Sequence, residues 1–162
     1  MVTFKRTGNK ANRGKPTEDA VAKALATWQG QRMDREFNRL VDSKAAGRII
    51  KAAAADFEFF INDFDDQYSL QAHHGLIEAK ETEHEFRIAR PKITQLPAMR
   101  RRRLSGGRCF VVVYHSTIKR YRAVSVRWLD ANGDKGSWNL EPIPTFETPI
   151  EALNWASSGL FA

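Results

Sequence analysis

Residues 108–116, RCFVVVYHS, form the most strand-like run of the chain, because they are rich in β-branched and aromatic side chains. The segment that follows, RYRAVSVRW at residues 120–128, alternates two sets of side chains, as a strand does. Together the two segments predict a β-hairpin. The lone cysteine, Cys109, falls inside the first of them, so it is expected to be a buried strand residue, and no internal disulfide can form.

Two further strands are expected upstream. In DFEFFI, residues 56–61, the side chains of Phe57, Phe59 and Ile61 share one face, which predicts a half-buried strand. The segment GLIEAKET, residues 75–82, reads as a second strand that pairs with the first. The intervening NDFDDQYS is rich in turn-forming Asn and Asp, and the histidines after it are expected in a loop.

Helices are expected in three places. PTEDAVAKALATW, residues 16–28, has apolar residues at helical spacing and acids in its first turn. In ITQLPAMRRRRLSGG, residues 93–107, Thr94 is expected to cap a helix that tolerates Pro97 in its first turn and buries Ile93, Leu96 and Leu104. TPIEALNWASSG, residues 148–159, predicts a closing helix with Ile150, Leu153 and Trp155 inward.

The remaining segments are less regular. Residues 29–51 have a mixed pattern, in which AGRIIK is a candidate short strand, and DANGDKGSWN, residues 130–139, reads as a turn. The order of helix, strands, helix, strands and helix predicts an α/β protein with a mixed central β-sheet flanked by helices.

The size and composition fit one domain. The chain has 162 residues, 42% of them hydrophobic, which predicts a flexible basic arm over residues 1–15 and a single globular domain over residues 16–162. No segment approaches the roughly 20 apolar residues that span a bilayer, and the start lacks the apolar core of a secretory signal. We therefore expect a cytoplasmic protein without a membrane partner.

Charge is segregated along the chain. Residues 1–51 carry 12 Lys and Arg against five Asp and Glu, whereas residues 52–86 carry one against nine. Residues 87–122 then carry 11 basic residues and no acidic one, and the net charge of the whole chain is +7. An acidic centre between basic blocks suits a protein that attracts a polyanion and holds a cation, although scattered surface charge is an equally good reading of composition alone.

The acidic centre contains a candidate catalytic cluster. Glu78 and Lys80 lie two residues apart in an expected strand, so both side chains point to one face, while Ile77 and Ala79 point to the other. A carboxylate near a core needs a charged partner or a metal, and Asp56 at the start of the preceding strand is the obvious companion. Two such carboxylates, with waters, suit a divalent cation such as Mg²⁺. Lys80 could then orient a water or stabilise a transition state in phosphodiester hydrolysis.

A Glu-x-Lys triplet by itself is a weak motif. The composition produces about 0.6 such triplets by chance in a chain of this length, and an exposed ion pair across a strand is the plain alternative. The order of neighbouring features strengthens it, because an acid on the first helix and an Asp-initiated strand precede the triplet and a basic helix follows it.

In this order the sequence resembles the PD-(D/E)XK nuclease superfamily, and within it the RecU-like and phage Holliday junction resolvases. The resemblance covers about residues 14–126 and rests on ADF, EAKET and the glutamine-bearing helix start ITQL. It assigns catalytic roles to Glu18, Asp56, Glu78, Lys80 and Gln95, and places a metal on Glu18, Asp56 and Glu78.

The resemblance also implies a restriction-endonuclease-like core, Mg²⁺ with Mn²⁺ as a substitute, a homodimer, and paired symmetric nicks in four-way DNA junctions. A phage origin would place the protein in the cytoplasm of a bacterial host. The link between the two catalytic strands is short here, so the long stalk of some RecU-type members is reduced or absent. That departure leaves the choice of junction over other DNA open.

Basic residues supply the candidate DNA contacts. Phosphate contact is expected for the run Arg100, Arg101, Arg102 and Arg103, which circles a helix, and Arg35, Arg39, Arg48 and Lys51 are candidates for which ordinary surface charge is as good a reading. The four histidines lack metal-ligand spacing and are read as surface or structural. Core positions are expected for Trp28, Trp128, Trp138 and Trp155 rather than base-stacking ones.

Three functions remain in competition. The first is a metal-dependent endonuclease that resolves Holliday junctions, and the second is a nuclease of the same superfamily that acts on flaps, mismatches or duplex DNA. The third is a non-catalytic DNA-binding protein in which the acids form ion pairs only. An RNA-cleaving role is less favoured, because no aromatic-rich single-strand motif is present.

Overall fold

A computed structural model describes residues 14–40, 53–64, 70–133 and 136–162. Most of the expected basic arm, the candidate strand AGRIIK, and the candidate DNA contacts Arg48 and Lys51 lie outside these residues. Among the described residues, no helix is long and apolar enough to cross a membrane.

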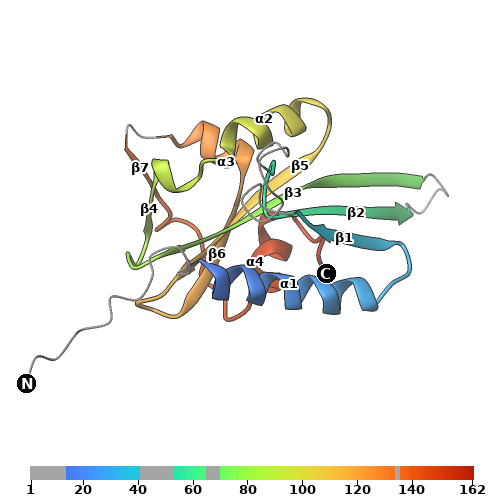
Figure 1. Cartoon of the computed structure of the whole chain (residues 1–162), viewed down its shortest axis with the longest axis horizontal. Helices are drawn as coiled ribbons and strands as arrows, with labels where there is room; N and C mark the ends of the chain where they lie inside the picture. Colours follow the sequence, from blue (N-terminus) through green and yellow to red (C-terminus); the bar gives the residue numbers. More distant parts are fainter. Residues whose placement is uncertain (1–13, 41–52, 65–69, 134–135) are drawn as a thin grey trace, which may run out of the picture.

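The fold is a five-stranded mixed sheet flanked by helices, as predicted (Figure 1). The sheet has the order β1-β2-β3-β5-β6, in which β3 and β5 run parallel and every other neighbouring pair is antiparallel. A separate two-stranded sheet joins β4 to β7. In chain order the elements are α1 (Lys15–Gly30), β1 (Arg35–Arg39), β2 (Phe57–Phe64), β3 (Leu70–Thr82), β4 (Arg87–Ala89), the 3₁₀ turn η2 (Arg90–Lys92), α2 (Leu96–Leu104), β5 (Arg108–His115), β6 (Arg120–Ser125), α3 (Val126–Ala131), β7 (Ser137–Asn139) and α4 (Pro149–Ala156).

Helices cover both faces of the five-stranded sheet. On one face, α1, α4 and the C-terminal Phe161 pack over Phe59 and Ile77. On the other face, α2 and α3 pack over a second set of strand residues that includes Val111 and Val113. Burial on both faces explains why the sequence of β5 is apolar at nearly every position instead of alternating. Cys109 is buried in β5, as expected.

The hairpin of β2 and β3 is longer than the sequence indicates. β2 continues to Phe64 and β3 begins at Leu70, and these two residues are partners in the ladder. The expected turn at residues 62–69 is therefore wrong at its start, and His73 and His74 lie in β3 rather than in a loop. Cross-strand pairing satisfies the backbone donors of this segment and overrides the turn preference of Asn and Asp.

Helix α2 differs from expectation in its cap and its buried face. Gln95, not Thr94, is the N-cap residue, and the Thr94 hydroxyl donates to the Gln95 side-chain oxygen. Pro97 lies in the first turn, where its missing N–H costs no helical hydrogen bond. Leu104, the last residue of α2, is 82% exposed, and Met99 is buried instead.

The C-terminal third of the chain also differs from the structure that the sequence predicts. The strand β6 ends at Ser125, whose hydroxyl accepts from the Trp128 backbone N–H at 3.1 Å and starts α3, so residues 126–128 are helical. Part of the expected turn at residues 130–139 is β7, which pairs with β4. In α4, Leu153 is buried as expected, but Trp155 is 47% exposed, and Leu160 and Phe161 after the helix lie in the core.

Candidate nuclease site

The structure keeps the predicted order of the candidate catalytic residues. Glu18 lies in the first turn of α1, and Asp56 immediately precedes β2. Glu78 and Lys80 lie on β3, and Gln95 caps α2. Because β2 and β3 are hydrogen-bonded neighbours, Asp56 lies next to Glu78, although the two residues are 22 positions apart in sequence.

Asp56 and Glu78 are fixed to each other through the backbone. The Asp56 backbone N–H donates to Glu78 Oε2 at 3.1 Å, and the Ala79 backbone N–H donates to Asp56 Oδ2 at 2.8 Å. The two side chains replace the ladder bonds expected just beyond the last β2–β3 partners, Phe57 and Ile77. Each carboxylate therefore has one oxygen held on the opposite strand, which orients the pair before any ligand binds.

Lys80 completes the cluster. Its ammonium lies 2.5 Å from Glu78 Oε1; the Glu78 side chain is fully buried, whereas 23% of the Lys80 side chain is exposed. The Lys80 ammonium is thus a charge partner of the buried Glu78 carboxylate, in addition to Asp56, the companion expected from the sequence. On the opposite face, Ile77 and Ala79 are buried in the core under α1 and α4, as predicted.

Burial changes the acidity of both carboxyls. Burial raises the pKa of Glu78 to about 7; the nearby Asp56 charge adds to the rise, and the Lys80 ammonium opposes it. Burial also raises the pKa of Asp56, against the hydrogen bond from Ala79 and the charge of Lys80. Two neighbouring carboxylates, one fully buried and one half-buried, raise each other's free energy when both are charged, and an added cation relieves that cost.

The donor set of this cluster fits a hard divalent cation. Glu78 Oε1 is a buried oxygen that takes no hydrogen bond in the described structure apart from its contact with the Lys80 ammonium. Mg²⁺ in proteins is commonly bound by one or two carboxylates and several waters, so Asp56 and Glu78 suffice. Among the described residues, no three His, Cys, Asp or Glu side chains lie together as a ready-made metal cage.

Glu18 and Gln95 stand apart from the Asp56–Glu78 pair. Glu18 accepts from Arg39 at 2.9 Å, and its charge acts on Asp56 by raising the pKa of that carboxyl. It also lines a pocket of about 460 Å³ together with Lys80. No hydrogen bond joins Gln95 to either acid in the described part of the chain; its side chain accepts from Thr94 instead. The structure thus puts Glu18 at the edge of the cluster.

The candidate DNA contacts are mostly engaged within the protein. Arg35 is only 7% exposed and donates to the carbonyl oxygens of Trp28 and Ala162, so the structure does not present it to a phosphate. Burial lowers the pKa of its guanidinium. Arg39 forms ion pairs with Glu18 and Asp19 at 2.9 Å each.

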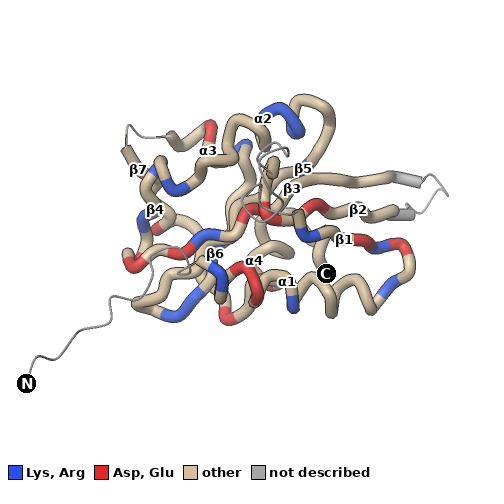
Figure 2. Tube along the Cα trace, in the orientation of Figure 1, with Lys and Arg blue, Asp and Glu red and all other residues tan. Residues whose placement is uncertain are grey.

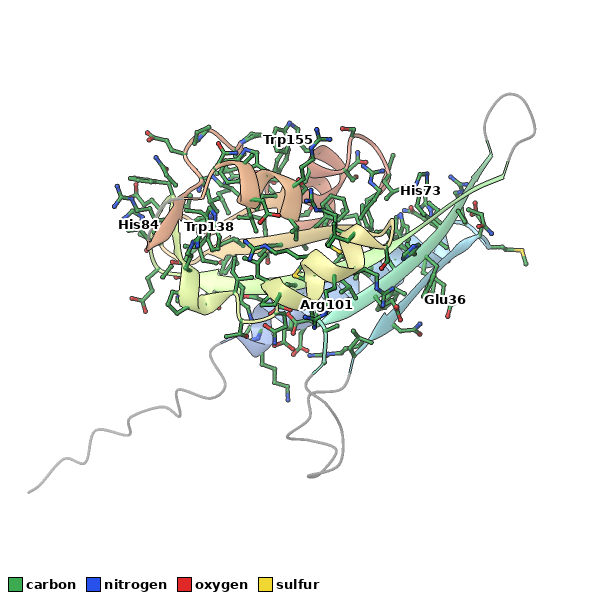
Figure 3. The ribbon with its side chains drawn as sticks, turned by 90° about the horizontal axis from the view of Figure 1, so that it is seen from above. Glu36, His73, His84, Arg101, Trp138 and Trp155 are labelled. Atoms are coloured by element: carbon green, nitrogen blue, oxygen red, sulfur yellow. The ribbon has the colours of Figure 1, made fainter. Side chains whose placement is uncertain are left out.

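The arginine run on α2 is also largely neutralised. Arg100 and Arg103 face Asp130 on α3 at 2.7 and 3.7 Å, and Arg102 faces Glu58 on β2 at 2.8 Å. Arg101 is exposed, and Figure 3 shows it on the outer side of α2. The run therefore attaches α2 to its neighbours as well as carrying surface charge.

Sequence patterns missed two residues that shape the pocket. The hydroxyl of Thr17, which is buried, donates to Glu81 Oε2 at 3.1 Å and ties the start of α1 to β3. The Lys92 ammonium donates to the Glu81 carbonyl oxygen at 2.9 Å from the far side of the pocket. These contacts span 64 and 11 positions, and no spacing in the sequence indicates them.

Comparison with known proteins finds distant likeness in structure but none in sequence. No protein-family model matches the chain, and no curated protein matches it. Among solved structures, the fold is similar to that of Hjc from Archaeoglobus fulgidus, a Holliday junction resolvase from an archaeal hyperthermophile. The two chains are 13% identical, the match covers 83% of this chain and 97% of that chain, and the TM-score is 0.49.

The raised pKa of Glu78 predicts a pH-dependent stability in the absence of metal. The native state binds a proton on Glu78 more tightly than the unfolded state does, so stability falls as pH rises from the unfolded pKa of 4.5 to about 7. Glu78→Gln removes this cost, and we expect it to increase the free energy of unfolding by about 1–3 kcal/mol at about pH 8, with little change at about pH 4.5.

Urea denaturation in EDTA at the two pH values measures this difference. The matched control is Glu36→Gln, which changes an exposed carboxylate on β1 and should show no comparable pH-dependent gain. An equal gain at both pH values would show that the effect of Glu78→Gln comes from packing rather than from the titration of Glu78.

Proposed function

We propose that the protein is a metal-dependent endodeoxyribonuclease, of Holliday junction resolvase type, that hydrolyses phosphodiester bonds in branched DNA. The observation that carries the proposal is the pair of the fully buried Glu78 and the half-buried Asp56, each held by a backbone N–H, with the Lys80 ammonium against the second oxygen of Glu78. Buried like charges are costly to keep, and a chain that needed only a stable strand would do better with apolar residues here.

Each residue has a role in this mechanism. Asp56 and Glu78 would hold the cation, which when bound would neutralise charge on the phosphate and make the attacking water more acidic. Lys80 is placed to orient the water or to stabilise negative charge on the phosphate oxygens as the phosphorus–oxygen bond breaks. Glu18, which lines a pocket with Lys80, would join the cation after releasing Arg39. Gln95 would act from the start of α2.

The finer parts of the proposal rest on the resemblance of the sequence motifs. We propose Mg²⁺ as the cation, with Mn²⁺ as a substitute, and a homodimer that makes two symmetric nicks, because a two-fold pair of sites matches a junction cut at two positions. RecU-like and phage resolvases are the nearest subgroup by motif, which would place the activity in the cytoplasm of a bacterial host.

A second candidate is a non-catalytic DNA-binding protein. It is favoured by the ion pairs that Glu18 and Glu78 already form with Arg39 and Lys80, since pairing alone would justify those acids. It is weakened by Asp56, which is half-buried beside a second carboxylate and has a raised pKa.

Cleavage of labelled DNA separates these functions. We expect paired, symmetric cuts in mobile and immobile four-way junctions with Mg²⁺ or Mn²⁺, and little cutting of linear duplex with the same sequence. Equal cutting of duplex or flapped DNA would assign the site to a repair or restriction-type nuclease. Salt-dependent binding without cutting in either metal would support the non-catalytic candidate.

A further inference from the structure

A short basic segment beside the pocket faces solvent. Residues 87–92, RIARPK, form β4 and η2, and here they are called the basic β4 segment. Arg87, Arg90 and Lys92 are exposed, whereas Ile88 is fully buried and anchors the segment in the core under α2 and α3. Figure 2 shows Lys and Arg positions along β4 and the stretch that follows it. The segment is thus fixed to the body by one apolar side chain and presents its cations outward.

Aromatic rings hold its two arginines in place. The Arg90 guanidinium carbon lies 4.9 Å from the centroid of the Trp138 ring, and the Trp138 side chain is itself fully buried, with its indole N–H on the Leu129 carbonyl oxygen. The Arg87 guanidinium carbon lies 5.7 Å from the centroid of the Phe86 ring. A guanidinium stacked on a ring keeps its N–H edge available for a planar, two-pronged contact with a phosphate.

The three cations differ from three of the four arginines of α2 in forming no ion pair with the described carboxylates. Within the described residues, none of Arg87, Arg90 and Lys92 forms an ion pair with a carboxylate, whereas Arg100, Arg102 and Arg103 all do. An arginine already paired with a carboxylate must break that pair before it contacts DNA. The basic β4 segment can bind a phosphate without that cost.

Lys92 connects the segment to the candidate site. It lines the same pocket as Lys80, and one of its three N–H donors is used on the Glu81 carbonyl oxygen. The remaining donors are available for a ligand in the pocket. His84, which also lines this pocket, and Trp138 are labelled at the same end of the molecule in Figure 3.

An acidic loop restricts the path that DNA can take. Residues 83–86 follow β3, and their backbone is held by two buried side chains, since His115 Nδ1 lies 2.7 Å from the His84 carbonyl oxygen and Arg122 donates to that of Glu85. Glu83 lines the pocket and Glu85 is exposed in the same loop. The carboxylates of the loop repel phosphates, whereas Lys92, which also lines the pocket, attracts them.

We propose that the basic β4 segment is the phosphate-binding track that leads a DNA strand into the pocket, with Lys92 nearest the reacting phosphate and Arg90 and Arg87 on successive phosphates. The proposal rests on the nuclease function proposed above. It assigns the principal backbone contacts to this segment, in place of the arginine run on α2.

The test compares two triple variants with the same change in net charge. Arg87→Gln/Arg90→Gln/Lys92→Gln removes the track, and Lys23→Gln/Lys119→Gln/Arg127→Gln removes three exposed cations elsewhere. Binding of a fluorescein-labelled four-way junction is measured by anisotropy in EDTA at several salt concentrations. For the track variant we expect at least about a tenfold loss of affinity. The slope of log affinity against log salt concentration should be shallower by about 2–3, because each phosphate contact contributes about 0.9 to it.

The control variant should lose no more than about threefold in affinity and keep its slope within about 0.5. Equal losses in the two triple variants would overturn the proposal, because net charge alone would then explain them. If the wild-type protein binds and cuts DNA and the track variant binds DNA equally well, the proposed track is wrong and the nuclease function stands. A wild-type protein that binds no DNA would overturn both.

A conservative variant covers the case in which the triple substitution perturbs folding. Arg90→Lys keeps the charge but loses the planar guanidinium that stacks on Trp138, and we expect it to weaken binding about three- to tenfold with an almost unchanged salt slope. Unaltered affinity in Arg90→Lys would contradict the role given to the stacked guanidinium. The Mg²⁺-dependent rise in melting temperature should be the same in these variants as in the wild type.

Discussion

Lys80→Ala is expected to lower the rate of Mg²⁺-dependent DNA cleavage by about 100- to 1,000-fold, while DNA affinity in EDTA changes by less than about threefold. Two effects act together. The substitution removes the cation nearest to Glu78, and it leaves that fully buried carboxyl without the ammonium that lowers its pKa. Glu78 then stays protonated to a higher pH and binds a metal less well. The residual activity should therefore appear at higher pH and at higher Mg²⁺ concentration than in the wild type.

Single-turnover cleavage across pH and Mg²⁺ concentration measures both effects. Lys23→Ala is the matched control, because Lys23 is exposed on α1 and outside the pocket, and wild-type activity is expected from it. Asp56→Asn and Glu78→Gln should also lose cleavage and retain junction binding. Cleavage at the wild-type rate by the Lys80→Ala protein would refute the proposed mechanism.

The fold could be predicted well where the pattern of side chains is local. The alternation of Phe57, Phe59 and Ile61, and the apolar run of β5, depend on neighbouring residues that point into one core or the other. Predictions failed where distant contacts decide the outcome. His73 is in a strand because it pairs with Ile61, and Trp155 is exposed because the C-terminal residues after α4 fill the core instead.

In the candidate site, too, local patterns could be predicted from the sequence and distant contacts could not. Asp56, Glu78 and Lys80 could be grouped from sequence, because two-residue alternation and strand pairing put their side chains at one place. The environment of the basic residues could not be deduced in this way. Arg35 was expected at the surface, but its guanidinium reaches the carbonyl oxygen of Ala162. No local pattern encodes a contact between residues 127 positions apart.

The position of β3 depends on one residue without a side chain. Gly75 is the partner of Arg108 where the parallel strands β3 and β5 begin to pair. A Cβ atom at position 75 would lie 1.6 Å from the Arg108 carbonyl oxygen and 2.9 Å from the Phe59 ring. The nearest of these atoms is backbone, so no rotation of a side chain can relieve the overlap. The glycine allows the close approach of two strands that carry the site and the core.

Gly75→Ala is accordingly expected to lower the free energy of unfolding by more than about 3 kcal/mol, because β3 and β5 must separate to admit the methyl group. Gly30→Ala provides the control; no atom lies within 4 Å of a Cβ at position 30, and the change should be within about 1 kcal/mol. Urea denaturation of both variants measures the difference, and a Gly75→Ala protein as stable as Gly30→Ala would contradict the close strand approach. Because Glu78 and Lys80 lie three and five residues further along β3, displacement of this strand should also reduce Mg²⁺ binding, measured as a smaller rise in melting temperature on adding Mg²⁺ than the wild type shows.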